Sequence, residues 1–247
     1  MPRRRAYVTR HPVAATNGRK CRTRNVLAEN CIARHGFALP AGYEPAHLIQ
    51  DCRGTSAGQM STFELKAFGY YADFVVYPLV IAGLAVAPAV SSQYVNPLHW
   101  IAAFLSGIFV WTLVEYLVHR FVLHHLVYFR DLHGLHHQSP TALIGTPVWM
   151  SFALLLVGVV LPSWWFFGFD IGSGFSAGMI TGYLAYTFAH HILHHWKMTP
   201  GTYLYRLKHK HALHHFRHED GNFGVTSLFW DYVFGTAVRS ARQRGRE

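Results

Sequence analysis

Charged residues are missing from three long stretches of this 247-residue chain. Asp, Glu, Lys and Arg are all absent between Asp73 and Glu115, between Asp131 and Asp170, and between Asp170 and Lys197. A helix needs about 20 predominantly apolar residues to cross a bilayer. The stretches therefore predict membrane-spanning helices. Their uncharged, aromatic-edged ends favour this interpretation over buried helices of a soluble protein.

The length of these stretches predicts an all-α integral membrane protein with about four transmembrane helices in two hairpins. We place the helices at about 74–92, 98–118, 147–168 and 172–193. A histidine-rich helical cap is expected at one end of the two hairpins.

The distribution of Lys and Arg predicts which side of the membrane carries this cap. The two connecting turns, near Asn96 and Asp170, contain neither residue. The other side carries Lys66, Arg120, Arg130, Lys197, Arg206, Lys208, Lys210, Arg217, Arg239, Arg242, Arg244 and Arg246. By the positive-inside rule, that side is expected to be cytoplasmic, together with both termini and the histidine-rich segments.

Cysteine is scarce, and the three residues, Cys21, Cys31 and Cys52, all lie far from the histidine-rich segments. Thiolate ligation of a metal is thereby excluded at those segments. An odd number of cysteines without a secretory signal also predicts no disulfide framework.

Residues 1–59 lack both the apolar segment of a signal peptide and any hydrophobic periodicity. Residues 1–60 hold ten Lys/Arg and three Asp/Glu, which is +7 of the chain's net charge of +10. We expect a disordered basic extension at 1–59, followed by one membrane-embedded domain at 60–247. A charge excess of this kind suits solvent or anionic lipid and does not indicate nucleic-acid binding.

Histidine is abundant, and most of the 19 residues fall in boxes that read HRFVLHH, HGLHH, HHILHH and HALHH. Residues i, i+3 and i+4 share one face of a helix, so HxxHH can present three imidazoles to one side. We predict ten metal ligands: His119, His124, His133, His136, His137, His190, His194, His211, His214 and His215. Ten imidazoles suit two ions. The alternative is a weak metal trap of the kind that histidine-rich tracts form.

His119 and His124 are five residues apart, about 140° around an ideal helix of 3.6 residues per turn. This pair therefore requires a broken helix end or two different metals. His191 and His195 form another i, i+4 pair, turned one step from the predicted ligands. We expect them to support the ligands or to replace them.

Two carboxylates lie where they could orient imidazoles. Glu115 is four residues before His119, so it is expected to accept the second imidazole N–H of that residue. The alternative for Glu115 is a side chain that reaches from the helix end to water. Asp231 is expected either to act similarly or to cap the following turn.

Neutral imidazole is a ligand for iron, zinc, copper and nickel. A pair of metals held by histidine at a membrane surface indicates oxygen activation, with two iron ions and O2 as co-substrate. The membrane location indicates a lipid or fatty acyl substrate. Zinc can substitute on purification, because it stands above iron(II) in the affinity order.

The boxes and their surroundings resemble the fatty acid hydroxylase/sterol desaturase superfamily of integral-membrane di-iron enzymes, and within it the fatty acid 2-hydroxylases. The resemblance covers about residues 98–237 and rests on WTLVEYLVHRFVLHH, LHGLHHQSP, AYTFAHHILHH, LKHKHALHHF and GNFGVTSLFWDYVFGT. It implies that the ten histidines bind two iron ions and that carbon 2 of a fatty acyl chain is hydroxylated.

The chain departs from these hydroxylases in two places. Where they carry Arg-Leu-Val-x-Pro-Pro after the second box, this sequence reads ALIGTPVW, so recognition of a head group is open. Residues 1–60 also lack the His-Pro-Gly-Gly motif of the haem domain that some relatives carry. The resemblance therefore implies a separate electron-donor protein.

Two alternatives remain at this point. A sterol or carotenoid oxidase or desaturase of the same superfamily would share the metal centre. A membrane metal transporter or metal-binding protein would favour ionisable residues at mid-bilayer, whereas the histidines here gather at one end of the spans.

Overall fold

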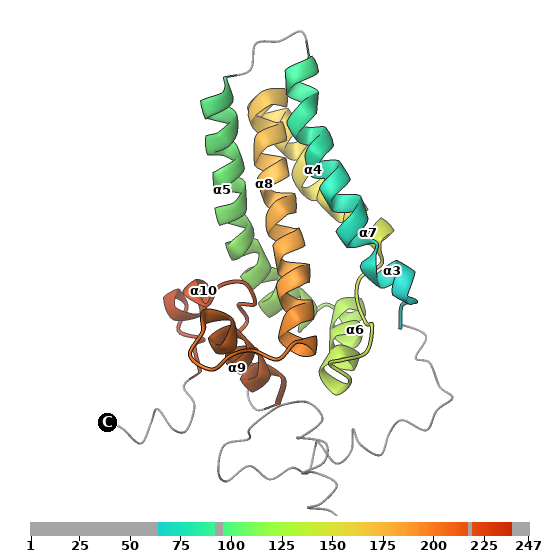
Figure 1. The fold of residues 1–247 in the computed structure, drawn as a ribbon, viewed down its shortest axis with the longest axis vertical. Helices are drawn as coiled ribbons and strands as arrows, with labels where there is room; N and C mark the ends of the chain where they lie inside the picture. Colours follow the sequence, from blue (N-terminus) through green and yellow to red (C-terminus); the bar gives the residue numbers. More distant parts are fainter. Residues whose placement is uncertain (1–63, 92–95, 217–218, 239–247) are drawn as a thin grey trace, which may run out of the picture. The chain divides into compact units, whose positions relative to one another are not determined.

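The computed structural model describes residues 64–91, 96–216 and 219–238, and the regular elements of these segments are helices (Figure 1). They are α3 (Ala67–Tyr71), α4 (Asp73–Val90), α5 (Pro97–Leu117), the π-helical η1 (Val118–Leu123), α6 (Val127–Gln138), α7 (Val148–Leu155), the π-helical η2 (Leu156–Val160), α8 (Leu161–His195), α9 (Tyr203–Phe216) and α10 (Phe229–Val233). An isolated bridge joins Glu64 to Ile144. The all-α prediction is confirmed for these residues. The predicted extension 1–59 lies outside them.

Three helical stretches are long and apolar enough to cross a membrane: Ala67–Pro88, Pro97–Leu123 and Val148–His195. Large apolar side chains along them point outward, including Leu98, which is 75% exposed, and Trp165, which is 84% exposed. An apolar surface of this extent fits contact with lipid rather than water. The chain is an integral membrane protein, as its uncharged stretches predict.

The chain reverses direction at Gly168, inside the third of these stretches. Gly168 has φ 73° and ψ 172°, a conformation that interrupts the helix and that side-chain-bearing residues rarely adopt. A Cβ on Gly172 would lie 2.7 Å from the carbonyl oxygen of Ser163. Nine residues of straight helix would separate these positions by about 13 Å. The segments before and after Gly168 therefore run back along each other.

Close packing between α5 and α8 fixes the two helices against each other. A Cβ on Gly178 would lie 2.0 Å from the carbonyl oxygen of Phe104, and one on Gly182 would lie 2.4 Å from the Trp111 ring. Glycine therefore lets the backbones approach closely, as small residues do between membrane helices. This contact sets the relative positions of the histidines that follow at the ends of α5 and α8.

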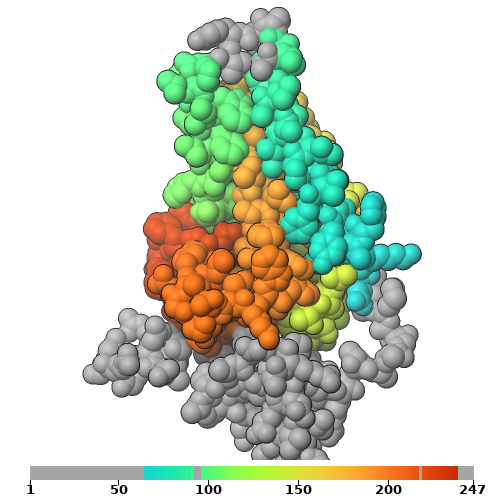
Figure 2. All heavy atoms as spheres, in the orientation of Figure 1, coloured from blue at the N-terminus to red at the C-terminus, as the bar shows by residue number. Residues whose placement is uncertain are grey.

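The shorter helices collect at one end of the long ones. In Figure 1, α6, α9 and α10 surround the ends of α5 and α8, and Figure 2 shows α9 and α10 gathered at this end in orange and red. Lys208 on α9 donates hydrogen bonds to the carbonyls of Leu193, at 2.7 Å, and Trp196, at 2.9 Å. These bonds satisfy carbonyl groups at the end of α8 and attach α9 to it.

Candidate metal centre

The structure brings together all ten histidines that the spacing singled out, in two groups of five. Within each group, one ring nitrogen per residue lies within 4.8 Å of the others. Group 1 consists of His119, His124, His133, His137 and His214. Group 2 consists of His136, His190, His194, His211 and His215.

A π-helical turn explains how His119 and His124 enter the same group. They lie at the start and just beyond the end of η1, and their rings stack with centroids 5.4 Å apart. A π-helix pairs residues i and i+5, so a separation of five residues returns to the same face. The five-residue spacing of His119 and His124 predicted a break in the regular helix, and the structure shows that this break is the wider π-helical turn of η1. The alternative, two different metals for this pair, does not match the arrangement.

Each HxxHH box is divided between the two groups. His133 and His137, one turn apart on α6, have Nε2 atoms 3.0 Å apart in group 1, whereas His136 belongs to group 2. On α9 the order is inverted, because His211 and His215 belong to group 2 and His214 to group 1. The sequence predicted three imidazoles on one side but not this division. The two groups consequently share α6 and α9.

The positions of the ring nitrogens fit a bound cation. The Nε2 atom of His194 lies 2.8 Å from that of His211, 3.1 Å from that of His136 and 3.3 Å from that of His190. An imidazole nitrogen either donates one N–H or accepts at one lone pair, so these three contacts are not all hydrogen bonds. Ligand atoms on one ion approach this closely when metal–nitrogen bonds are about 2.0–2.1 Å long. The donor set fits a metal that accepts imidazole.

Burial keeps these imidazoles neutral. Desolvation, together with neighbouring histidines, lowers the pKa of His133, His136, His211 and His215 well below its ordinary value. The same causes lower the pKa of His137 to about 3. A neutral ring has a free lone pair, which is the form that binds a metal.

Backbone carbonyls of the loop 221–226 orient two ligands of group 1. The Nδ1 atom of His119 lies 2.6 Å from the carbonyl oxygen of Phe223, and that of His214 lies 2.9 Å from the carbonyl oxygen of Gly221. An Nδ1–H that donates to a carbonyl leaves Nε2 unprotonated and fixes the ring. Phe223 was missed by the sequence reasoning, because a backbone carbonyl leaves no signal in residue type.

The expected contact between Glu115 and His119 is wrong, because the carbonyl of Phe223 takes that place. Glu115 is only 3% exposed. Its Oε1 accepts hydrogen bonds from the N–H groups of Val225, at 2.7 Å, and Thr226, at 2.8 Å, and its Oε2 accepts one from the Thr226 hydroxyl. A buried carboxylate needs several donors, and the loop supplies them.

Asp231 holds the same loop from α10. Its Oδ1 accepts from the N–H of Phe223 at 2.9 Å and from the Thr236 hydroxyl at 2.7 Å, while its Oδ2 accepts from the N–H of Gly224 at 2.8 Å. It therefore neither contacts an imidazole nor serves only as a cap. Both carboxylates act on the loop whose carbonyls orient the histidines.

The second pair on α8, His191 and His195, stays outside both groups. Their rings stack on each other with centroids 4.3 Å apart, and His191 Nδ1 lies 3.2 Å from the Tyr70 hydroxyl. One residue further along a helix turns a side chain by about 100°, which directs this pair away from the centre. The expectation that they support or replace the ligands is therefore wrong for this arrangement.

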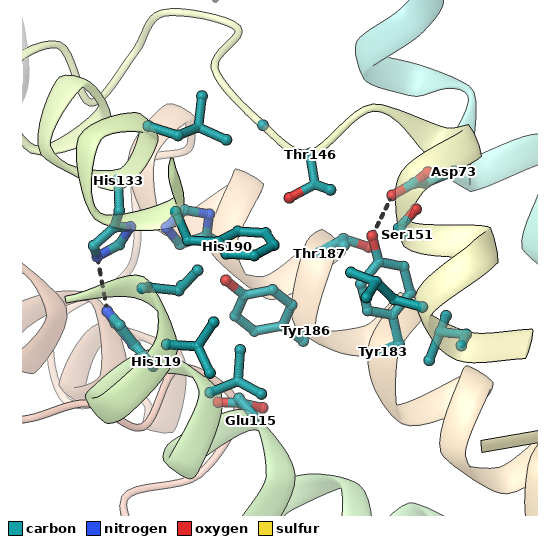
Figure 3. A pocket seen from close by; sticks show the side chains of 18 of the residues that line it. Asp73, Glu115, His119, His133, Thr146, Ser151, Tyr183, Tyr186, Thr187 and His190 are labelled. Carbon is teal, nitrogen blue, oxygen red and sulfur yellow. Dashed lines mark hydrogen bonds between the residues drawn. The ribbon is translucent and has the colours of Figure 1, made fainter. Parts of the chain in front are cut away.

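A cavity of about 550 Å³ adjoins both groups. His119 and His133 of group 1 and His136 and His190 of group 2 line it, together with mostly apolar side chains from the segments between Leu65 and α8. Figure 3 places the histidines on one side and Asp73, Ser151 and Tyr183 on the other. The segment that departs from the related hydroxylases contributes Ile144, Gly145 and Thr146 to the lining.

The family is decided by comparison with known proteins. The sequence profile of the fatty acid hydroxylase family matches residues 104–236, a range that contains all ten histidines, Glu115 and Asp231. This chain belongs to the fatty acid hydroxylase family. The resemblance inferred from the histidine boxes is thereby confirmed.

Relatives from this family include fatty acid 2-hydroxylases. The chain is 35% identical to the fatty acid 2-hydroxylase of Macaca fascicularis over 155 residues, which cover 55% of this chain and 39% of that protein. It is 35% identical to the ceramide very long chain fatty acid hydroxylase SCS7 of Saccharomyces cerevisiae over 178 residues, 64% of this chain and 43% of that protein. The chain thus spans about two fifths of the length of these relatives.

A solved structure has the same fold. Full-length scs7p, of which only the hydroxylase domain is visible, superposes with a TM-score of 0.62 and is 26% identical. The superposition covers 87% of this chain and 93% of that one.

Proposed function

We propose that this protein is a membrane di-iron monooxygenase that places a hydroxyl group on carbon 2 of a fatty acyl chain. One observation carries the proposal: two groups of five histidines lie at the side of an apolar cavity in a membrane protein. The names of the relatives, fatty acid 2-hydroxylase and ceramide very long chain fatty acid hydroxylase, support the substrate class.

Groups 1 and 2 would each hold one iron ion, and zinc can take the same ligands. Two iron ions bound there would supply the activation of O2 needed to oxidise an unactivated C–H bond. Electrons would come from a separate donor protein.

The chain's own residues position the substrate. His119 and His133 of one group and His136 and His190 of the other face the cavity, so a bound acyl chain meets both groups. The apolar wall holds the chain and excludes water from the reacting carbon. The carbonyls of Phe223 and Gly221 keep the ligand rings in place.

We further propose four membrane crossings, with the metal centre and both termini on the cytoplasmic side. The reversal at Gly168 supports two crossings within Val148–His195. The Lys and Arg distribution supports the orientation.

Mass spectrometry of lipids from cells that express the full chain tests the activity. A His214→Ala variant, expressed to the same level, is the matched control, because its ring lies in group 1. We expect 2-hydroxy acyl chains with the wild type and none above background with the variant. Oxidised sterols or carotenoids without 2-hydroxy acyl chains would replace this proposal with the alternative within the superfamily.

A further inference from the structure

A second polar cluster lies in the cavity, away from the histidines. The Tyr183 hydroxyl on α8 donates a hydrogen bond of 2.7 Å to Oδ2 of Asp73 on α4. Beside it, the Tyr77 hydroxyl and Ser151 Oγ are 2.7 Å apart, and Ser151 Oγ lies 3.1 Å from the Val148 carbonyl oxygen. The cluster joins α4, α7 and α8 around one carboxylate.

One oxygen of this carboxylate has no donor. Asp73 is 7% exposed, and its Oδ1 has no hydrogen-bond partner among the residues that the structure describes. A buried acceptor without a donor is costly, and an ionisable residue within a membrane span is a mark of a functional site. The Oδ1 atom is not needed to hold α4 against α8, because the hydrogen bond from the Tyr183 hydroxyl to Oδ2 already joins these helices.

The cluster faces the same cavity as the metal centre. Asp73, Ser151 and Tyr183 line the cavity with His119 and His190, and Figure 3 shows them across it. Tyr183 precedes His190 by seven residues, two turns of α8, or about 10 Å of helix rise. The polar cluster and the histidines therefore lie about two helical turns apart along the wall of the cavity.

We propose that Asp73 accepts a hydrogen bond from a neutral donor of the substrate, a hydroxyl or an amide N–H, and thereby selects a donor-bearing lipid over an ionised free fatty acid. Two ionised carboxyl groups offer each other only acceptors and like charge, so Asp73 in its ionised form disfavours an ionised acid at this position. This inference deepens the proposed function, because it takes the cavity to be the substrate site.

Binding to the purified full chain in detergent tests the proposal separately from activity. Three probes share one acyl chain: an N-acyl amino alcohol with free hydroxyls, the same amide with its hydroxyls methylated, and the free fatty acid. We expect the wild type to bind a neutral probe at least about tenfold more tightly than the acid, the effect of one charge-assisted hydrogen bond. The methylated probe distinguishes hydroxyl from amide recognition.

Asp73→Asn is the test variant, since asparagine keeps the size and can donate to an acid. We expect the affinity ratio of neutral probe to acid to fall by about tenfold. Asp170→Asn, a carboxylate of α8 outside the cavity lining, is the matched control and should keep the wild-type ratio. An unchanged ratio in Asp73→Asn, with all three probes weakened equally, would overturn the proposal in favour of a purely structural carboxylate.

Two further measurements separate the possible failures. If Asp73→Asn does not fold, Tyr183→Phe keeps the carboxylate and should keep the preference for the neutral probe, whereas loss of that preference would overturn the role of Asp73. Wild-type protein that selects the neutral probe in detergent, but whose expression in cells yields no 2-hydroxy acyl chains, would support the Asp73 subsite and contradict the proposed function.

Discussion

At the scale of single residues, two buried carboxylates act on imidazoles through a peptide loop. Glu115 binds the N–H groups of Val225 and Thr226, and Asp231 binds those of Phe223 and Gly224. In the described part of the chain, the loop carbonyls that contact imidazoles are those of Phe223 and Gly221, and both contact group 1 residues. The Nδ1 atoms of three group 2 residues, His136, His211 and His215, have no hydrogen-bond partner in the described part of the chain, whereas in group 1 this holds for His137 alone. The two groups therefore differ in how firmly their rings are held.

Removal of Glu115 should loosen group 1 selectively. Glu115→Ala leaves the loop N–H groups without their acceptor, so we expect metal retention in group 1 to fall by about 10–100-fold, the usual effect of losing a group that supports a ligand. Glu115→Gln keeps one acceptor oxygen and should retain an intermediate affinity. Metal content after a timed chelator challenge measures this, with Asp170→Ala as control. Equal retention in all four proteins would show that the carboxylate has no role at the metals.

Adjacent histidines should serve different ions. His136 belongs to group 2, whereas His137 and His133 belong to group 1. Starting from about two ions per chain, the double variant His133→Ala/His137→Ala should lose one ion. His136→Ala/His137→Ala should lose both, because it damages both groups. Elemental analysis of folded protein measures the content, and equal losses in the two double variants would contradict the division of the box.

At the scale of helices, regular geometry was predictable and its interruptions were not. Spacing of three and four residues selected eight of the ten clustered histidines, because a regular helix has a fixed period. A regular α-helix would place His119 and His124 about 140° apart. The structure instead has the π-helical turn of η1 between them, which the sequence pattern did not predict. Glu115 was misassigned for a related reason. Its partners, Val225 and Thr226, are 110 and 111 residues away, and such contacts depend on tertiary structure.

The packing of α5 on α8 should be sensitive to a single methyl group. Gly178→Ala places a Cβ 2.0 Å from the Phe104 carbonyl oxygen, so the helices must separate. We expect the free energy of unfolding to fall by about 1–3 kcal/mol, as in overpacked cores. Gly83→Ala on α4 is the control, because its Cβ meets nothing within 4 Å and alanine favours a helix. Thermal unfolding in detergent compares them, and equal midpoints would mean that this close approach contributes little.

At the scale of the whole molecule, the membrane-spanning helices were predictable from the sequence, whereas the cavity between them was not. Uncharged stretches predicted the apolar helices, and their exposed side chains suit lipid. The cavity between them was not predictable, because its lining comes from every helix from α3 to α8 and includes Asp73, Ser151 and Tyr183, which no local motif distinguishes. Asp73 had a weak signal as the last charge before a long apolar run.

The shared metal groups constrain how often the chain crosses the membrane. α6 and α9 both contribute to both groups, so Gln138 and Tyr203 lie at the same end of the long helices. The connection between them must therefore cross an even number of times, which the reversal at Gly168 permits. Fusions of a topology reporter after Gln138 and after Arg242 should both report the cytoplasm, and a fusion after Asp170 should report the outside. Opposite sides for Gln138 and Arg242 would require an odd number of crossings and would contradict four spans.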